Sequence, residues 1–99
     1  MSQNASQSER RRAERRVGPP VRIAWEGVDF ECTHSGWIND ESAVGVAFVT
    51  STRTEPAPGD EIELTYGAGT RSPRYRTARV VRTAPYDRYF SVVGCQLPQ

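Results

Sequence analysis

Apolar side chains recur at every second position in several short runs after Pro20. Six runs show this alternation or a β-branched composition that fits it, at 21–25, 28–38, 44–48, 62–66, 74–83 and 89–97. A period of two is typical of strands that turn one face to a core and the other to solvent. The pattern therefore predicts six short strands.

Turn-forming residues separate the six runs. Glu26-Gly27 joins the first two into a hairpin, Asn39-Asp40 ends the second, and the connections 51–60, 67–73 and 84–87 are rich in turn-forming residues. No segment of this region shows a helical period. The sequence predicts an all-β fold, a compact six-stranded antiparallel β-barrel, because closure removes exposed sheet edges.

The first 16 residues differ in composition from the rest of the chain. Residues 1–10 are small and polar, too poor in apolar side chains to order around a core. Gly18-Pro19-Pro20 would end any helix that began in the preceding segment. We predict a flexible arm over residues 1–16 and a single barrel domain over 17–99, without a C-terminal helix.

Charge is distributed unevenly between these two parts. All thirteen basic residues are arginines, and the formal net charge is +1. Residues 1–16 carry five arginines and two glutamates, hence +3, and the remaining chain carries −2. Proteins that bind nucleic acid over a broad surface are usually more basic than this. The distribution favours a local role for the arm.

The sequence indicates neither a leader segment nor a metal site. Its start lacks the apolar centre of a signal peptide, and no run approaches the ~20 apolar residues that span a bilayer. Cys32 and Cys95 are far apart and lack metal-ligand spacing. We predict that both are small buried thiols in a reducing compartment, and that the protein is cytoplasmic.

The arm concentrates guanidinium groups within residues 9–16. Its arginines are Arg10, Arg11, Arg12, Arg15 and Arg16. A guanidinium group can hold a phosphate through two hydrogen bonds, stack on a purine, or pair with guanine O6 and N7. Arginines four residues apart can therefore contact both the base and the phosphate of one nucleotide. A solvated basic tail without a specific ligand is the alternative.

A short polar segment follows the predicted second strand. Asp40 can accept hydrogen bonds from guanine N1 and N2, and Ser42 can donate to a phosphate or cap a turn. Gly45 lets a ligand or a neighbouring backbone come close, because it lacks a Cβ atom. The alternative is an ordinary turn that leads into the next strand. Taken alone, DxSxxG is a weak motif.

The order of these features, RxxxR and then DxSxxG after a hairpin, resembles the PilZ domain family over residues 9–97. Arg12 to Arg16 is the preferred register of RxxxR, because Val17 follows it as a hydrophobic residue usually does in the family. Arg11 to Arg15 has the same spacing, so the register stays open. The second motif is matched by Asp40, Ser42 and Gly45.

The resemblance implies a six-stranded barrel that binds the bacterial second messenger cyclic di-GMP through both motifs. The arm would fold over the nucleotide and create a surface that an effector protein reads. The arginine before RxxxR, Arg11 or Arg10 according to the register, implies a stacked pair of ligand molecules. No cofactor and no enzymatic activity is implied. Two departures from the family are the missing C-terminal helix and Val80 or Val81 in place of a guanine-stacking aromatic residue.

Several other polar and aromatic residues are expected to have structural roles. His34 has no catalytic partner at a suggestive spacing, and Trp25 and Trp37 are expected in the core or at its rim. Asp40 and Glu41 would point to opposite faces of a strand and so would not form a catalytic pair. A solvated outer face, with one possible phosphate contact, is expected for Arg74, Arg76, Arg79 and Arg82.

Two other functions remain compatible with the sequence. A PilZ-type adaptor would engage protein partners without nucleotide. A nucleic-acid-binding barrel would use the arm with a salt-dependent affinity and without preference for the cyclic dinucleotide. The slightly acidic barrel disfavours this second function, and an enzyme is the least supported class.

Overall fold

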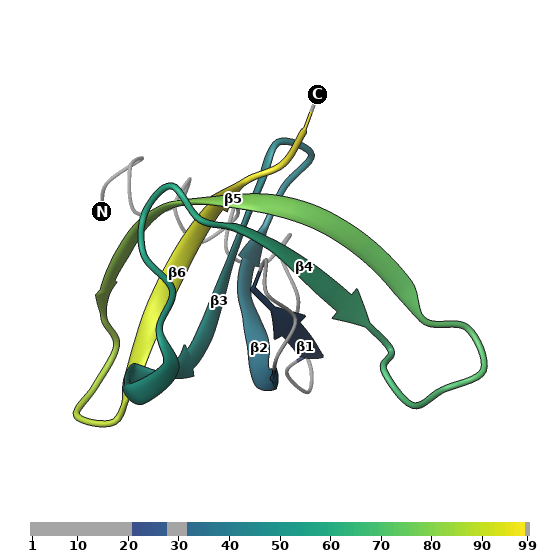
Figure 1. Ribbon diagram of the computed structural model, residues 1–99, viewed down its shortest axis with the longest axis horizontal. Helices are drawn as coiled ribbons and strands as arrows, with labels where there is room; N and C mark the ends of the chain where they lie inside the picture. The colour runs from purple at the N-terminus through teal and green to yellow at the C-terminus, as the bar shows by residue number, and fades with distance from the viewer. Residues whose placement is uncertain (1–20, 28–31, 99) are drawn as a thin grey trace, which may run out of the picture.

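The computed structural model of the protein describes residues 21–27 and 32–98, which form six strands (Figure 1). The strands are β1 (Arg22–Glu26), β2 (Thr33–Glu41), β3 (Gly45–Ser51), β4 (Glu61–Tyr66), β5 (Arg74–Pro85) and β6 (Phe90–Gln96). The predicted arm lies outside the described residues. The described ranges contain no α-helix, and their one helical turn is the 3-10 segment η1 (Thr52–Thr54) in the predicted loop.

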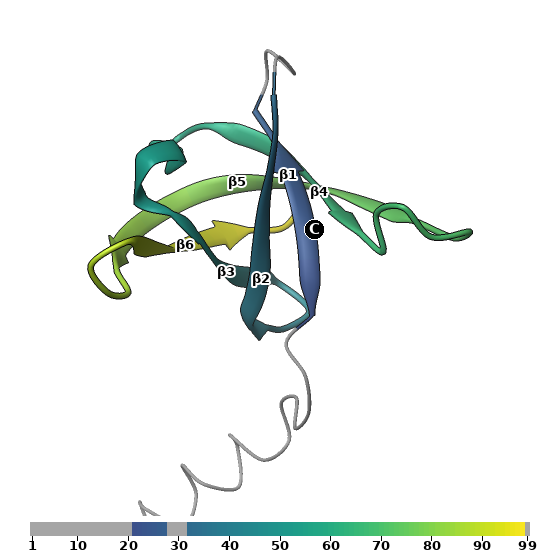
Figure 2. The same cartoon turned by 90° about the horizontal axis from the view of Figure 1, so that it is seen from below.

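The six strands close into an antiparallel barrel. The strand order is β1-β2-β3-β6-β5-β4, and β4 pairs with β1 to complete the ring. The long strand β5 curves over the barrel in Figure 1, and Figure 2 shows β1 and β2 running steeply across the direction of β5 and β6. Closure leaves none of these six strands as an open edge. The predicted all-β, six-stranded antiparallel fold is confirmed.

Alternate residues of the strands fill the barrel interior. Eleven strand residues and Leu97, just beyond β6, form the core: Ile23, Trp25, Val46, Phe48, Ile62, Leu64, Tyr66, Ala78, Val80, Val93, Cys95 and Leu97. The rings of Trp25 and Phe48 lie 5.9 Å apart. Trp25 Nε1 donates a hydrogen bond of 3.0 Å to Thr50 Oγ1, which satisfies the one polar atom of the indole. The expected core position of Trp25 is confirmed.

Two predictions about the second strand are wrong. β2 does not turn at Asn39-Asp40 but continues to Glu41, because pairing with β3 extends that far. Cys32 is exposed rather than buried, since it precedes the first residue of β2 that pairs with β1. Cys95 is buried as predicted. Residues 28–31 of the predicted strand lie outside the described residues, and the other strand boundaries agree with prediction to within three residues.

Two β-bulges interrupt the alternation, one in β2 and one in β5. The register shifts between Ile38 and Asp40 against β3, and between Val80 and Arg82 against β6. Ile38 and Val80 pack in or against the core, so strict alternation would turn residues 40 and 82 inward as well. The extra residue at each bulge instead turns Asp40 and Arg82 to the outer face.

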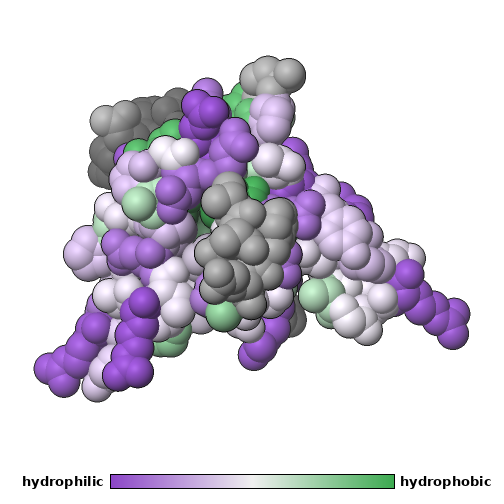
Figure 3. All heavy atoms as spheres, viewed as in Figure 1, coloured by the Kyte–Doolittle hydropathy of each residue, from purple (hydrophilic) through white to green (hydrophobic). Residues whose placement is uncertain are grey.

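The outer surface is largely hydrophilic in the view of Figure 3. The connection between β4 and β5 projects from one end of the barrel in Figure 1, and hydrophilic side chains extend from the same end in Figure 3. Residues 65–86, which include this connection, contain five arginines and no acidic residue. Three of the four predicted outer-face arginines are exposed, whereas Arg76 is half-buried and lies 3.8 Å from Glu41.

Candidate ligand-binding site

The turn between β2 and β3 is organised by Ser42. The backbone N–H of Ser42 donates to Gly45 O at 2.9 Å, and the N–H groups of Val44 and Gly45 donate to Ser42 Oγ at 3.3 and 3.2 Å. One hydroxyl oxygen thus satisfies two backbone donors of a tight turn. The serine of DxSxxG therefore has a structural role in the turn, where its hydroxyl also donates to Gly45 O at 3.4 Å, and the residue as a whole is exposed.

Gly45 is needed for the close approach of β6. It pairs with Gln96, and a Cβ atom at position 45 would lie only 3.0 Å from the carbonyl oxygen of Cys95. The neighbouring carbonyl belongs to the backbone of a paired strand and cannot move easily. A side chain at this position would also occupy space beside the turn, where Gly45 lines a surface pocket.

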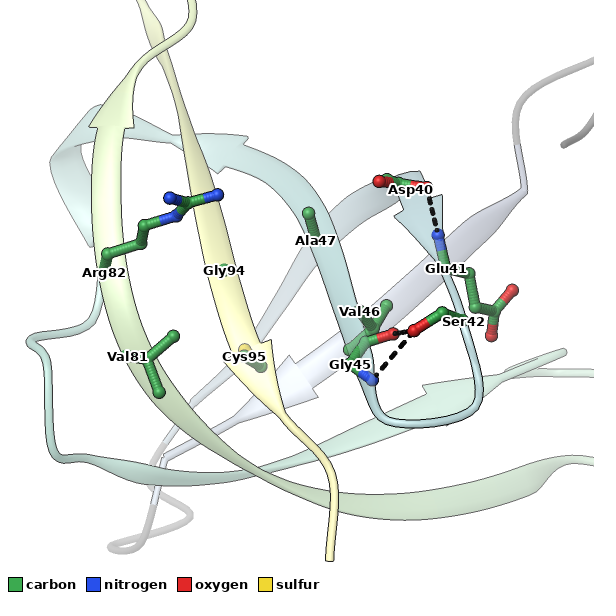
Figure 4. A pocket seen from close by; sticks show the side chains of 10 residues that line it. All are labelled: Asp40, Glu41, Ser42, Gly45, Val46, Ala47, Val81, Arg82, Gly94 and Cys95. Atoms are coloured by element: carbon green, nitrogen blue, oxygen red, sulfur yellow. Dashed lines mark hydrogen bonds between the residues drawn. The ribbon is translucent and has the colours of Figure 1, made fainter. Parts of the chain in front are cut away.

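Asp40, Ser42 and Gly45 lie around one pocket of about 310 Å³ on the outer face of the barrel (Figure 4). The other lining residues are Glu41, Val46, Ala47, Val81, Arg82, Gly94 and Cys95. One register row crosses four strands here: Asp40 pairs with Ala47, Ala47 with Gly94, and Gly94 with Arg82. Two small residues form the middle of the row, and a carboxylate and a guanidinium lie at its ends.

The two neighbouring carboxylates at the end of β2 point apart, as Figure 4 shows. Asp40 Oδ1 accepts the backbone N–H of Glu41 at 2.9 Å. Glu41 Oε2 accepts a hydrogen bond of 3.0 Å from the Tyr66 hydroxyl and lies 3.8 Å from Arg76 Nη1. The predicted divergence of the two side chains is confirmed, although both residues line the pocket. Glu41 also ties the turn to β4 and β5.

Two buried acids of the barrel have raised pKa values. Burial, followed by the hydrogen bond and the charge of Glu41, raises the pKa of Tyr66 from 10.0 to about 12. Burial alone raises the pKa of the Cys95 thiol from 9.0 to about 12. The folded state therefore keeps both protons at pH values where the unfolded chain has lost them.

The free energy of unfolding is expected to fall as the pH rises from about 9 to 12, because the unfolded state then binds fewer protons. Each group contributes a slope of about 1.4 kcal/mol per pH unit, from about pH 9 for Cys95 and pH 10 for Tyr66. Urea denaturation across this range measures the slope. The Tyr66→Phe variant should show a flatter dependence above pH 10, and an unchanged slope would contradict this account.

The described chain begins beside this pocket. Ile38 N donates a hydrogen bond of 2.8 Å to Val21 O, which places the start of the first strand two residues from Asp40. The candidate arm residues Arg10, Arg11, Arg12, Arg15 and Arg16 lie outside the described residues. Five residues of extended chain reach up to about 17 Å. Arg16 is therefore within reach of the pocket from Val21.

The other residues considered in the sequence analysis pack against neighbouring side chains or line the pocket. The His34 ring lies against Trp25 with centroids 4.5 Å apart, and Trp37 packs edge-on against Phe90 at 5.2 Å. Val80 is buried, whereas Val81 is 50% exposed and lines the pocket, so Val81 is the one of the two on the pocket side. Within residues 21–27 and 32–98, no group of three metal-ligating side chains occurs, and no helix is long and apolar enough to cross a membrane.

Sequence reasoning did not identify Ala47 and Gly94 as pocket residues, and it left Arg82 among four equivalent arginines. Ala47, Gly94 and Arg82 come together through strand pairing and the β5 bulge, and the local sequence predicts neither of these features. Of the four, Arg82 is the one whose side chain lines the DxSxxG pocket.

Comparisons with known proteins agree with this architecture. A family model described as the PilZ domain matches residues 9–99. No curated protein matches the sequence. The crystal structure of the PilZ domain of CeSA from a cellulose-synthesizing bacterium is similar, with a TM-score of 0.58 and 12% identity, over 84% of this chain and 81% of that chain. At this identity the structural likeness supports the fold alone.

Proposed function

The chain belongs to the PilZ domain family, and on that premise we propose that it is a receptor for cyclic di-GMP. PilZ domains are in general binding or adaptor domains rather than enzymes, and the family includes cyclic di-GMP receptors. The observation that carries the proposal is the pocket at which Asp40, Ser42 and Gly45 meet, close to Val21, the first described residue after the arm.

In this proposal the barrel and the arm hold the nucleotide from opposite sides. Asp40 accepts hydrogen bonds from guanine N1–H and N2–H, and the open surface at Gly45 lets the ligand approach the backbone. The arm arginines of RxxxR contact the phosphates and the guanine base. Ordering residues 9–17 costs part of the binding free energy but creates a new surface for an effector protein.

Calorimetric titration of the full chain with cyclic di-GMP tests the proposal. We expect selective, saturable binding, with GTP and cyclic di-AMP as control ligands. A ratio near two ligands per chain is expected if the arginine before RxxxR supports a stacked pair, because a further cation offsets the repulsion between closely packed phosphates. Absence of heat, together with an unchanged thermal midpoint, would refute the receptor function.

A nucleotide-independent adaptor is the second candidate, and an aromatic cluster on the outer face supports it. Trp37 packs edge-on against Tyr86 at 6.4 Å as well as against Phe90, and the Tyr86 side chain is 50% exposed. Half-exposed aromatic residues are common at protein interfaces. An adaptor would bind its partner protein equally well with and without cyclic di-GMP, whereas a receptor would not.

A further inference from the structure

Of the two β5 arginines without an acidic partner in the described ranges, Arg74 lies over the Tyr66 ring, and Arg82 lines the pocket. Arg79 Nη2 lies 3.3 Å from Glu61 Oε2, and Arg76 lies 3.8 Å from Glu41. Among the residues that the structure describes, Arg82 forms no such ion pair. Its guanidinium group is exposed and can receive an anion from outside the protein.

The β5 bulge places Arg82 on the pocket side. Without it, Arg82 would follow Val80 into the core, where an unpaired guanidinium is strongly unfavourable. The bulge interrupts the regular pairing of β5 with β6, and Val81 is half exposed there. β-Bulges often lie beside binding sites, where they redirect a side chain. The matching bulge of β2 redirects Asp40 to the opposite end of the same row.

Gly94 lets the Arg82 side chain lie across β6. A Cβ atom at position 94 would be 3.3 Å from both Cγ and Nε of Arg82, so the stem of the arginine rests close over the glycine. Figure 4 shows the guanidinium group directed over β6 toward Ala47 and the pocket. A larger residue at position 94 would lift the arginine from this position.

From this geometry we propose that Arg82 is a phosphate-binding residue carried by the barrel itself, an inference that rests on the proposed function. Three strand spacings, or about 14 Å, separate the backbones of Asp40 and Arg82. The Arg82 side chain covers part of that distance, so one dinucleotide can engage both ends of the row. The carboxylate suits the guanine N–H donors, and the guanidinium suits a phosphate.

The test compares full-length variants by titration with cyclic di-GMP at low and high salt. Arg82→Ala should weaken binding about 10- to 100-fold, as expected for loss of a charge-assisted hydrogen bond. Arg79→Ala is the matched control, since its guanidinium is paired with Glu61 outside this pocket, and should change affinity less than about twofold. The affinity of Arg82→Ala should also depend less on salt, because one phosphate contact is missing.

Three outcomes are informative. Weaker, less salt-sensitive binding by Arg82→Ala with an unchanged urea midpoint supports the assignment. Equal affinity and equal salt dependence in the Arg82→Ala and Arg79→Ala variants would overturn it and leave the receptor function intact. Failure of the unaltered chain to bind cyclic di-GMP would overturn both proposals.

Discussion

Replacing Arg16 by alanine is expected to weaken cyclic di-GMP binding at least about 100-fold, and Arg12→Ala is expected to do the same. A guanidinium that holds a phosphate makes two charge-assisted hydrogen bonds, each worth roughly 1.5–3 kcal/mol. Calorimetric titration measures the loss. The urea midpoint should not change, because the core residues in the described part of the chain all follow the arm, from Ile23 onward.

The control variants also settle the register of RxxxR. In the preferred register Arg15→Ala has a small effect, and Arg11→Ala lowers the ratio of ligand to protein from two toward one. In the alternative register Arg11→Ala and Arg15→Ala cause the large loss. Arg53→Ala is the matched control, because Arg53 is exposed in η1, beyond the end of β3 that lies away from the pocket. Full affinity in all four arm variants would exclude a role for the arm.

The fold was predictable because every strand of the barrel has a core-facing side. Alternation at Ile62, Leu64 and Tyr66, for example, appears in the sequence as directly as in the structure. The position of β6 between β3 and β5 was not predictable, because the hydrophobic pattern of a strand does not determine which strands it pairs with. The bulges were equally invisible, because an extra residue is defined only against a partner strand.

The candidate site also has a part that the sequence predicts and a part that it does not. Asp40, Ser42 and Gly45 are close in sequence, so a short motif was enough to identify them. Arg82 and Gly94, about 40 and 50 residues later in the chain than the motif, join it only through the pairing of β6 with β3 and β5. The turn itself was misplaced, because the turn preference of Asn39-Asp40 is weaker than the β2–β3 ladder that continues to Glu41.

Gly36→Val is expected to destabilise the barrel by about 3 kcal/mol or more. Gly36 is buried in β2, in register with Ile23 of the core. A Cβ atom there would lie 2.6 Å from Val49 O and 3.3 Å from a ring carbon of Phe48. The Val49 carbonyl is part of the barrel backbone, so β3 would have to move away from β2. Small domains have a total stability of only about 5–15 kcal/mol, so this loss should lower the urea midpoint strongly.

Gly94→Val is the matched control, because it places the same side chain at another strand glycine with different neighbours. The atoms nearest to a Cβ at position 94 belong to the flexible side chain of Arg82, which can move aside. Its free energy of unfolding should therefore change by only about 0.5 kcal/mol. Binding of cyclic di-GMP should weaken instead, since the displaced arginine no longer faces the pocket. Equal stability of the two variants would contradict the close β2–β3 contact. A loss of stability in Gly36→Val and a loss of affinity in Gly94→Val would show that Gly36 is needed for barrel packing and that Gly94 is needed for the binding surface.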